Sequence, residues 1–388
     1  MGLAEGYDHF AQEYVVDPFP LWKRMREEEP VARSENHGGY YIVTRYEDVR
    51  AAAKDAATFS SAQGTGIPPL PIVGMIPIDI DPPDQREYRR ILNPAFNVEE
   101  VAKHEDRVRT LVRELIDPLV GQESFEVAEA LATQLPPRTT LGFIGFPRED
   151  WPTLIKAVDD ITRLRGSAPE EVVQAGMVLM GAVGALLEQR KAEPGNDLID
   201  LLMAGQFRDR PLEDQEIIRI VAIILFGAID TTSLAITGSL YYLAQRPEAQ
   251  QRLRDEGVSS SAVEEFVRWN CPVQGLGRTV TQDAELAGCP MKQGDKVMLM
   301  WASANRDESV FSDPDTLDFD RRPNPHVGFG DGPHKCVGLN FGKLMLRIVL
   351  EEFLQRIGPF ELADPDSIQY VGGETRGIKN LVLRPVAA

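Results

Sequence analysis

The stretch FGDGPHKCVG occupies residues 329–338, just before an apolar-faced segment, residues 339–355, that is expected to form the last helix. Gly330 and Gly332 precede the cysteine and allow a tight turn that approaches a flat ligand closely. Cys336 stands ahead of the expected helix, where unpaired backbone N–H groups and the helix dipole lower a thiol pKa and favour a thiolate. Gly338 leaves space for the plane of a ligand. The stretch thus predicts a cysteine with ligand-binding chemistry.

Taken alone, Cys336 has two other interpretations. Most free cysteines are small buried hydrophobic residues. A zinc site could use His334 and Cys336, although no Cys-x-x-Cys pair supplies the remaining ligands. Cys271 and Cys289 have no comparable loop and are interpreted as structural. Three cysteines are too few for a disulfide framework, so a reducing, cytoplasmic location is expected.

A second decisive feature is the apolar segment 212–245, which is expected to form one long helix. It begins after Pro211, with acidic residues in the first turn, and ends before Pro247. At 1.5 Å per residue it would run about 50 Å. Its middle, residues 220–228, is apolar on all sides and is therefore expected to be buried.

A polar notch interrupts this apolar helix. Gly227 weakens the helix by about 1 kcal/mol relative to alanine. Asp230 is costly in such surroundings unless it has a partner or a purpose. Thr231 can bond the carbonyl one turn back and bend the helix. A structural kink with a hydrogen-bonded aspartate explains these residues as well as a functional site does.

The remaining sequence predicts a mainly α protein with a small β region, folded as a single domain over residues 1–388. Residues 62–83 are rich in glycine and proline yet contain apolar residues, which either line a cavity or fold onto the core. Residues 302–335 are expected to be irregular. The other expected helices are 21–29, 47–54, 84–95, 99–119, 151–163, 169–191 and 262–268, and the expected strands are 40–44, one near 279, 296–299 and 381–383.

The composition restricts the partners. Lys and Arg number 41 against 60 Asp and Glu, and the resulting net charge of −19 repels nucleic acid and anionic lipid. The N-terminus lacks the basic start and apolar run of a signal peptide. The longest apolar run, residues 220–229, is shorter than the roughly 20 residues of a membrane span. We expect a soluble cytoplasmic monomer without nucleic-acid or membrane partners.

The cysteine loop resembles the haem-binding signature of the cytochrome P450 family, which sets Phe, Gly, His or Arg, Cys and Gly at fixed spacing. Phe329, Gly332, His334, Cys336 and Gly338 match every position. The resemblance implies a cytochrome P450 fold in which haem b (iron protoporphyrin IX) lies between the long central helix and the C-terminal helix. It also implies that Cys336 is the axial thiolate ligand of the iron, a ligand that favours O–O cleavage.

The notch resembles the family's small-small-any-acid-Thr motif on the oxygen side of haem, with Gly227, Ala228, Asp230 and Thr231 in those positions. The Gly-Ala order reverses the usual one. The resemblance implies that Thr231 hydrogen-bonds bound dioxygen and that Asp230 relays protons from solvent.

Other residues match the family's haem-propionate partners: Gln85, Arg89, Arg278 and His326. Gln85 replaces the usual histidine and carries no charge, so a propionate there would be held less tightly. The pair Glu265 and Arg268 resembles the family's Glu-x-x-Arg, which with Arg321 would form a buried structural triad.

The resemblance runs from Asp17 to the end of the chain and implies a monooxygenase: RH, O2, two electrons and two protons give ROH and H2O. The residues implied for the pocket are mostly apolar, so the substrate is expected to be a terpenoid, steroid-like or aromatic small molecule. They are 70–76, parts of 163–180, Ile223, Phe226, Gly227, Val273, Leu276 and Val371.

The sequence contains no flavin or iron–sulfur motif, so the electrons are expected from a separate ferredoxin with its reductase. Lys335, Lys343 and Arg347 are predicted to form a basic patch near the cysteine for this partner. Two alternatives are a haem-thiolate enzyme that uses peroxide or isomerises its substrate, and a haem sensor or carrier without turnover. Thr231 with Asp230 argues against the first.

Overall fold

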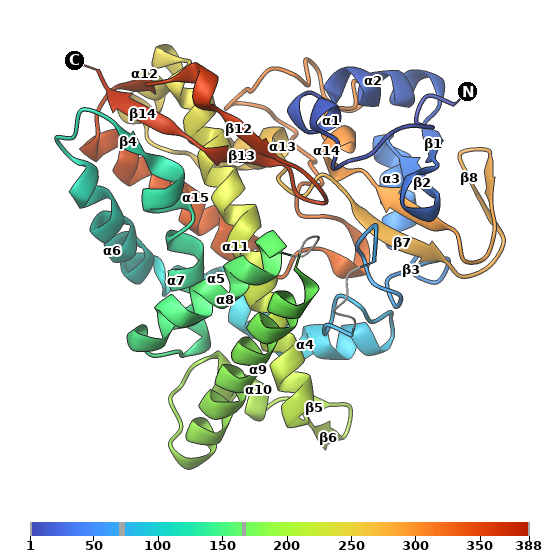
Figure 1. Ribbon diagram of the computed structural model, residues 1–388, viewed down its shortest axis with the longest axis horizontal. Helices are drawn as coiled ribbons and strands as arrows, with labels where there is room; N and C mark the ends of the chain where they lie inside the picture. The colour runs from blue at the N-terminus through green and yellow to red at the C-terminus, as the bar shows by residue number, and fades with distance from the viewer. Residues whose placement is uncertain (1, 70–73, 165–167, 387–388) are drawn as a thin grey trace.

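The helix α11 (Asp214–Ala244) runs through the middle of the molecule in the computed structural model, which describes residues 2–69, 74–164 and 168–386 (Figure 1). Its 31 residues confirm the long helix predicted over 212–245. A capping box begins it, in which the Glu213 side chain accepts from the third helical N–H and the Glu216 side chain accepts from the Glu213 N–H. Its packing partners include α7 (Leu135–Ile144), α9 (Pro169–Ala192), α15 (Leu339–Arg356) and β13 (Gly377–Asn380).

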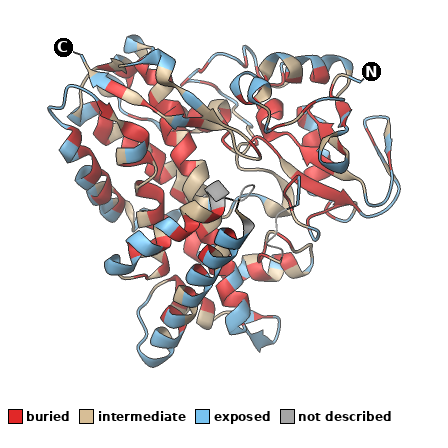
Figure 2. Ribbon diagram, viewed as in Figure 1, coloured by how far each residue is buried: buried red, intermediate tan, exposed pale blue. Residues whose placement is uncertain are grey.

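The middle of α11 is not buried on all sides, so that prediction was wrong in part. Ile220, Val221 and Leu225 are fully buried, whereas Phe226 is half-buried and Gly227 is exposed. One face of the helix packs against its neighbours, and the face that carries the polar notch does not. Figure 2 shows the same contrast across the molecule, with buried residues gathered on the inner faces of the helices.

Most other predicted helices are present. One prediction was wrong: residues 99–119 form not one helix but α5 (Val98–Ala102), α6 (Glu105–Ile116) and a short 3-10 turn (Asp117–Leu119). The break lets α5 pack on α4 and α15 while α6 packs on α15 and α7. The confirmed helices are α2 (Phe19–Glu28), α3 (Tyr46–Lys54), α4 (Asp84–Phe96), α8 (Trp151–Leu164), α9, α13 (Ser260–Asn270) and α15.

Several further helices were not predicted from the sequence. They are α1 (Gln12–Val16), a π-helical turn (Ala128–Ala132), α7, α10 (Leu198–Met203), α12 (Pro247–Glu256) and α14 (Trp301–Ala304). Two of them, α7 and α12, carry proline in the first turn, where the missing N–H costs nothing.

The main sheet has five strands in the order β1-β2-β10-β7-β3. It joins distant parts of the chain, because β2 pairs in parallel with β10, with Ile42 opposite Met298. The predicted strands 40–44, near 279 and 296–299 are all in it. The strands are β1 (Val31–Ser34), β2 (Tyr40–Val43), β10 (Lys296–Leu299), β7 (Leu276–Val280) and β3 (Phe59–Ser60).

The remaining strands form small sheets. The predicted strand 381–383 overlaps β14 (Val382–Pro385), which lies between β11 (Phe360–Leu362) and β4 (Phe125–Glu126). Two-stranded pairs are β12 (Gln369–Val371) with β13, β5 (Gln206–Phe207) with β6 (Arg210–Pro211), and β8 (Ala284–Leu286) with β9 (Cys289–Met291).

Two hydrophobic clusters make up the core. The larger fills the space between the helices, and the smaller covers the five-stranded sheet. The short 3-10 turn η5 (Gly332–His334) contacts α3 beside the sheet, and the chain then enters α15 in the helical cluster. The cysteine loop therefore lies between the two clusters.

By length and composition, α9 and α11 could each cross a membrane. Half of the most apolar window of α11 is buried, and a third of that of α9. The contacts of α11 with four other elements identify it as a core helix of the fold.

Candidate active site

The loop before α15 has a fixed shape. Gly330 and Gly332 adopt positive φ angles of 72° and 70°. The N–H of Cys336 donates to the carbonyl of Phe329 at 2.9 Å and closes the turn. A Cβ on Gly332 would lie 2.3 Å from the carbonyl oxygen of Ala53, so only glycine fits there.

Cys336 is accessible within this loop. Its side chain is exposed, yet burial among surrounding protein raises the pKa of its thiol. The Gly338 N–H and the charge of Arg89 oppose this shift without overcoming it. The prediction that the helix end lowers the pKa of this thiol was therefore wrong for the protein by itself. A Cβ on Gly338 would meet only the Cys336 Sγ, at 4.0 Å. The sulfur is therefore accessible, and Gly338 leaves space beside it.

Near Cys336 lie three cationic or donor side chains that pair with no carboxylate among the described residues. The buried Arg278 donates only to the carbonyl of the adjacent Gly277, at 2.7 Å, and burial lowers its pKa to about 10. The half-buried Arg89 makes no hydrogen bond or ion pair within the described part of the chain. The Nε2 atom of His334 is buried and finds no hydrogen-bond partner in the part of the chain that the structure describes.

These three side chains influence one another. Burial and then the charge of Arg278 lower the pKa of His334 to about 4, and Arg89 acts in the same direction. The carboxylate of Asp81 lies near them but already accepts from Ser60 Oγ and from the Ser61 N–H at 2.9 Å. Buried cations are normally paired. Haem has two propionate carboxylates, so this cluster beside an accessible cysteine fits haem.

The structure places two other predicted propionate partners differently. Gln85 is buried, and its Nε2 donates to the carbonyl of Pro333 at 2.5 Å, which ties α4 to the cysteine loop. His326 is bonded through Nε2 to Glu264 at 2.8 Å and accepts the N–H of Gly328 through Nδ1 at 3.2 Å. Both nitrogens of His326 are engaged, so the structure does not bring it into the cluster with Arg278 and His334.

On α11, the hydroxyl of Thr231 donates to the carbonyl of Gly227 at 2.9 Å, one turn back. This is the bond that a structural kink would use, yet α11 continues over all of its residues. Asp230 and Thr231 are half-buried, and a Cβ on Gly227 would meet nothing within 4 Å. The notch is therefore an open polar face on a continuous helix.

Most of the described residues predicted to line the pocket retain accessible surface. Gly227 is exposed, and Ile223, Phe226, Val273, Leu276 and Val371 are half-buried. Met75 and Ile76, from the predicted loop 70–76, are buried. Gly74 is half-buried, whereas residues 70–73 of that loop and residues 165–167 of the predicted range 163–180 lie outside the described residues.

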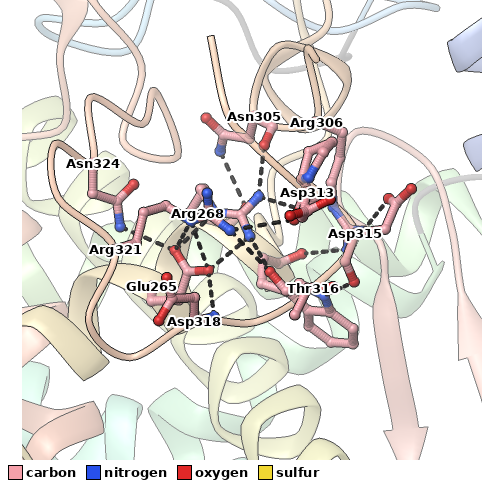
Figure 3. Close-up of polar contacts among 12 residues, drawn as sticks. Glu265, Arg268, Asn305, Arg306, Asp313, Asp315, Thr316, Asp318, Arg321 and Asn324 are labelled. Atoms are coloured by element: carbon pink, nitrogen blue, oxygen red, sulfur yellow. Dashed lines mark hydrogen bonds and ion pairs between the residues drawn. The ribbon is translucent and has the colours of Figure 1, made fainter.

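The predicted triad forms a buried network of polar contacts (Figure 3). Arg268 donates to both carboxylate oxygens of Glu265 at 2.8 Å, and Arg321 Nε lies 3.1 Å from each of them. The backbone N–H of Asp318 and the amide of Asn324 also donate to Glu265. Arg268 and Glu265 are fully buried, so the network holds the segment before the cysteine loop against α13.

The predicted basic patch was wrong in part. Lys343 is paired with Glu264 at 2.5 Å, and Arg347 with Glu105 at 2.6 Å and Glu351 at 2.9 Å. These carboxylates come from α13, α6 and the next turn of α15, and they neutralise two of the three cations. Lys335 remains exposed.

A further support for the loop was not foreseen. Arg50 on α3 donates to Asp331 at 2.6 Å, and Asp331 accepts the N–H of Gly332 at 2.8 Å. The hydroxyl of Tyr46 donates to the carbonyl of Pro325 at 2.6 Å. Since these partners are far apart in the sequence, no local pattern could have indicated them.

Comparison with known proteins agrees with this geometry. The family model described as Cytochrome P450 matches residues 148–367. The chain is 32% identical to "Linalool 8-monooxygenase" of Pseudomonas putida over 94% of both chains, and 32% identical to "Steroid C26-monooxygenase" of Mycolicibacterium smegmatis over 88% of this chain and 86% of that protein.

Solved structures agree as well. Cytochrome P450 CYP109Q5 from Chondromyces apiculatus superposes with a TM-score of 0.90 at 27% identity, covering 99% of both chains. CYP109E1 from Bacillus megaterium in complex with testosterone gives 0.87 at 26% identity, covering 97% of this chain and all of that one. The chain is therefore a member of the cytochrome P450 family, a haem-dependent oxidoreductase of the monooxygenase type.

Proposed function

We propose that this monooxygenase transfers one oxygen atom of O2 to a hydrophobic small molecule of the terpenoid, steroid-like or aromatic class. Two electrons come from a separate ferredoxin and its reductase, and two protons carry the second oxygen atom away as water. The observation that carries this proposal is the accessible Cys336 Sγ, with Arg89 and the unpartnered His334 Nε2 near it, in a fold whose long helix α11 has an open polar face.

The proposed roles around haem b follow from these contacts. Cys336 holds the iron as a thiolate, and Arg89, Arg278 and His334 bind the propionates by charge-assisted hydrogen bonds. The glycines Gly332 and Gly338, with Phe329 at the turn, keep the loop close to the plane of the ligand. When bound, haem with a thiolate ligand supplies oxygen activation and favours O–O cleavage.

Thr231 and Asp230 have the proposed role of handling protons. The Thr231 hydroxyl can rotate from the Gly227 carbonyl and present its proton on the open face of α11. Asp230, the adjacent carboxylate, passes protons from solvent to this face. The apolar side chains of Ile223 and Phe226 on the same helix exclude bulk water, so that protons arrive only through the two polar residues.

The substrate class follows from the apolar side chains that retain accessible surface, among them Val273, Leu276 and Val371. Two relatives are named for a terpenoid and a steroid, which supports the same class. We further propose that the chain acts as a soluble cytoplasmic monomer of one domain, with no nucleic-acid or membrane partner. Its acidic charge supports that exclusion.

A spectral titration tests the substrate class. Haem-loaded protein is titrated with terpenoids, steroids and aromatic compounds while the Soret band is followed, because a substrate that displaces the water bound to iron changes the spin state. We expect a shift with at least one apolar class and none with polar analogues of similar size.

A second measurement separates turnover from sensing. With a ferredoxin, its reductase and NADH, a compound that shifts the Soret band should also accelerate NADH consumption and yield a hydroxylated product. Binding without NADH consumption would favour a haem sensor, and product formed only with added peroxide would favour a peroxide-driven enzyme.

A further inference from the structure

Far from the cysteine loop, three potential metal ligands meet where the N-terminal segment crosses the end of strand β1. They are Asp8 and His9 in the N-terminal segment and His37 in the 3-10 turn η1 (Asn36–Gly38). One ligand atom from each lies within 4.8 Å of the others. The Asp8 carboxylate and His37 Nε2 are already 2.9 Å apart.

The backbone around these residues is held in place. The Ser34 hydroxyl donates to the carbonyl of Tyr7 at 2.7 Å, and the Asn36 amide donates to the same carbonyl at 3.1 Å. The N–H of Glu35 donates to the carbonyl of Glu5 at 3.1 Å. These bonds join the two segments that carry the ligands, so the cluster does not depend on the side chains alone.

His9 carries the second observation. It is 1% exposed, and its Nδ1 lies 3.2 Å from the hydroxyl of Tyr40. Its buried Nε2 meets no hydrogen-bond partner in full geometry among the described residues. Buried polar atoms are normally satisfied. A ligating histidine commonly binds the metal through one nitrogen and is oriented by a hydrogen bond at the other, and Tyr40 can supply that bond.

We infer that Asp8, His9 and His37 bind a divalent transition-metal ion of the zinc class. Two imidazoles and one carboxylate are a donor set that Zn²⁺ takes, with the fourth position left for water. Tetrahedral zinc separates its ligands by roughly 3.3 Å, so the three atoms need to move by at most about 1.5 Å. His37 is exposed and Asp8 half-buried, which leaves a path for the ion and the water.

The site has a structural consequence. The carbonyl of His9 accepts the N–H of Gly373 at 3.0 Å, and a Cβ on Gly372 would lie 2.0 Å from Val15. The N-terminal segment therefore packs directly on the turn between β12 and β13, and β12 ends at Val371. Zinc at this site fastens the segment that supports one wall of the proposed substrate pocket.

Elemental analysis tests the site independently of turnover. Haem-loaded protein is freed of loose metal with a chelator, equilibrated with zinc sulfate and desalted, and zinc and iron are counted per chain. We expect one zinc in addition to the haem iron. Asp8→Asn and His37→Ala should each weaken zinc binding at least tenfold in calorimetric titration, while His104→Gln, a histidine outside the cluster, should not.

Wild-type protein that retains no zinc, or an Asp8→Asn or His37→Ala variant that binds zinc as wild type does, would overturn the inference. Hydrogen exchange gives a second readout. Zinc should slow exchange at residues 8–10 and 36–39 in the wild type and in His104→Gln, but not in His37→Ala. Equal slowing in His37→Ala would place the ion elsewhere.

Discussion

Two buried arginines of this protein have opposite surroundings. Arg268 donates to both oxygens of Glu265 and to three backbone carbonyls, so each of its three guanidinium nitrogens has a partner. Arg278 donates only to the carbonyl of Gly277 beside it. A buried guanidinium that is fully satisfied stabilises the chain around it, whereas one without a counter-charge is arranged for an anion that comes with a ligand. We therefore assign the first to the scaffold and propose the second for the cofactor site.

The contrast between Arg268 and Arg278 bears on function only if Cys336 binds haem next to Arg278. Cys336→Ser replaces the thiolate by an alcohol that is not deprotonated at neutral pH. We expect product formation to be abolished and the red-shifted absorption of the reduced carbon monoxide complex to disappear. Cys289→Ser, at a cysteine far from the loop, is the matched control. Full turnover by Cys336→Ser would remove the assigned chemistry.

Removing the carboxylate partner of the buried Arg268 should lower the stability of the fold. Glu265→Gln removes the charge that balances Arg268 and Arg321 in a fully buried setting. Removing one partner of such a network costs about 3–5 kcal/mol of unfolding free energy, measured by urea denaturation. Glu256→Gln, which breaks an exposed pair with Arg252, should cost less than about 1 kcal/mol. Equal effects would mean that burial does not decide the energy.

Removing the charge of the unpaired Arg278 should weaken haem binding without destabilising the haem-free protein. Arg278→Gln removes a buried charge that has no carboxylate partner, so the haem-free protein should be as stable as wild type or more stable. Losing a charge-assisted hydrogen bond to a propionate costs about 1.5–3 kcal/mol of haem binding. Haem transfer to apomyoglobin should therefore be roughly tenfold faster or more. The exposed Arg322→Gln is the control, and unchanged transfer by Arg278→Gln would reassign the cluster to structure.

A substitution of Thr231, on the open face of α11, should have a smaller effect than the substitutions above. Thr231→Ala loses one bond to its own helix, so stability should fall by less than about 1 kcal/mol. Product formed per NADH should fall several-fold while peroxide release rises, because a proton donor is lost. Thr231→Ser keeps the hydroxyl and should restore coupling. Unchanged coupling in Thr231→Ala would favour the structural interpretation of the notch.

The smallest effect concerns His326, which has a carboxylate partner, Glu264, as Arg268 has Glu265. Burial would raise the pKa of Glu264, but hydrogen bonds from His326 and Lys343 outweigh it and lower the pKa from 4.5 to about 2. A carboxyl with a depressed folded-state pKa stabilises the fold above pH 4.5, and this contribution is lost as the pH falls toward 2. In Glu264→Gln this part of the acid sensitivity should be missing.

Haem transfer completes that test. Neither Glu264→Gln nor His326→Gln should accelerate haem loss, in contrast to Arg278→Gln. Accelerated loss in His326→Gln alone would restore His326 to the propionate partners that the sequence predicted.

The local features of the site could be predicted because each rests on neighbouring residues. A positive-φ glycine before a cysteine at a helix start, or a glycine and a threonine one turn apart on a helix, is visible in a few letters of sequence. The basic patch was predicted from single cations, and its neutralising carboxylates on α6 and α13 could not be seen. For the same reason the sequence could not tell that His326 turns toward Glu264.

The sequence by itself determined the long central helix, the cysteine turn and the set of residue types around it, because helix periodicity and turn chemistry act over a few residues. Only the tertiary structure decided which buried cations are paired, that one face of α11 stays open, and that Asp8 and His9 lie beside His37. Pairing and burial depend on segments that are brought together by packing, and their partners are separated by tens to hundreds of residues in the chain.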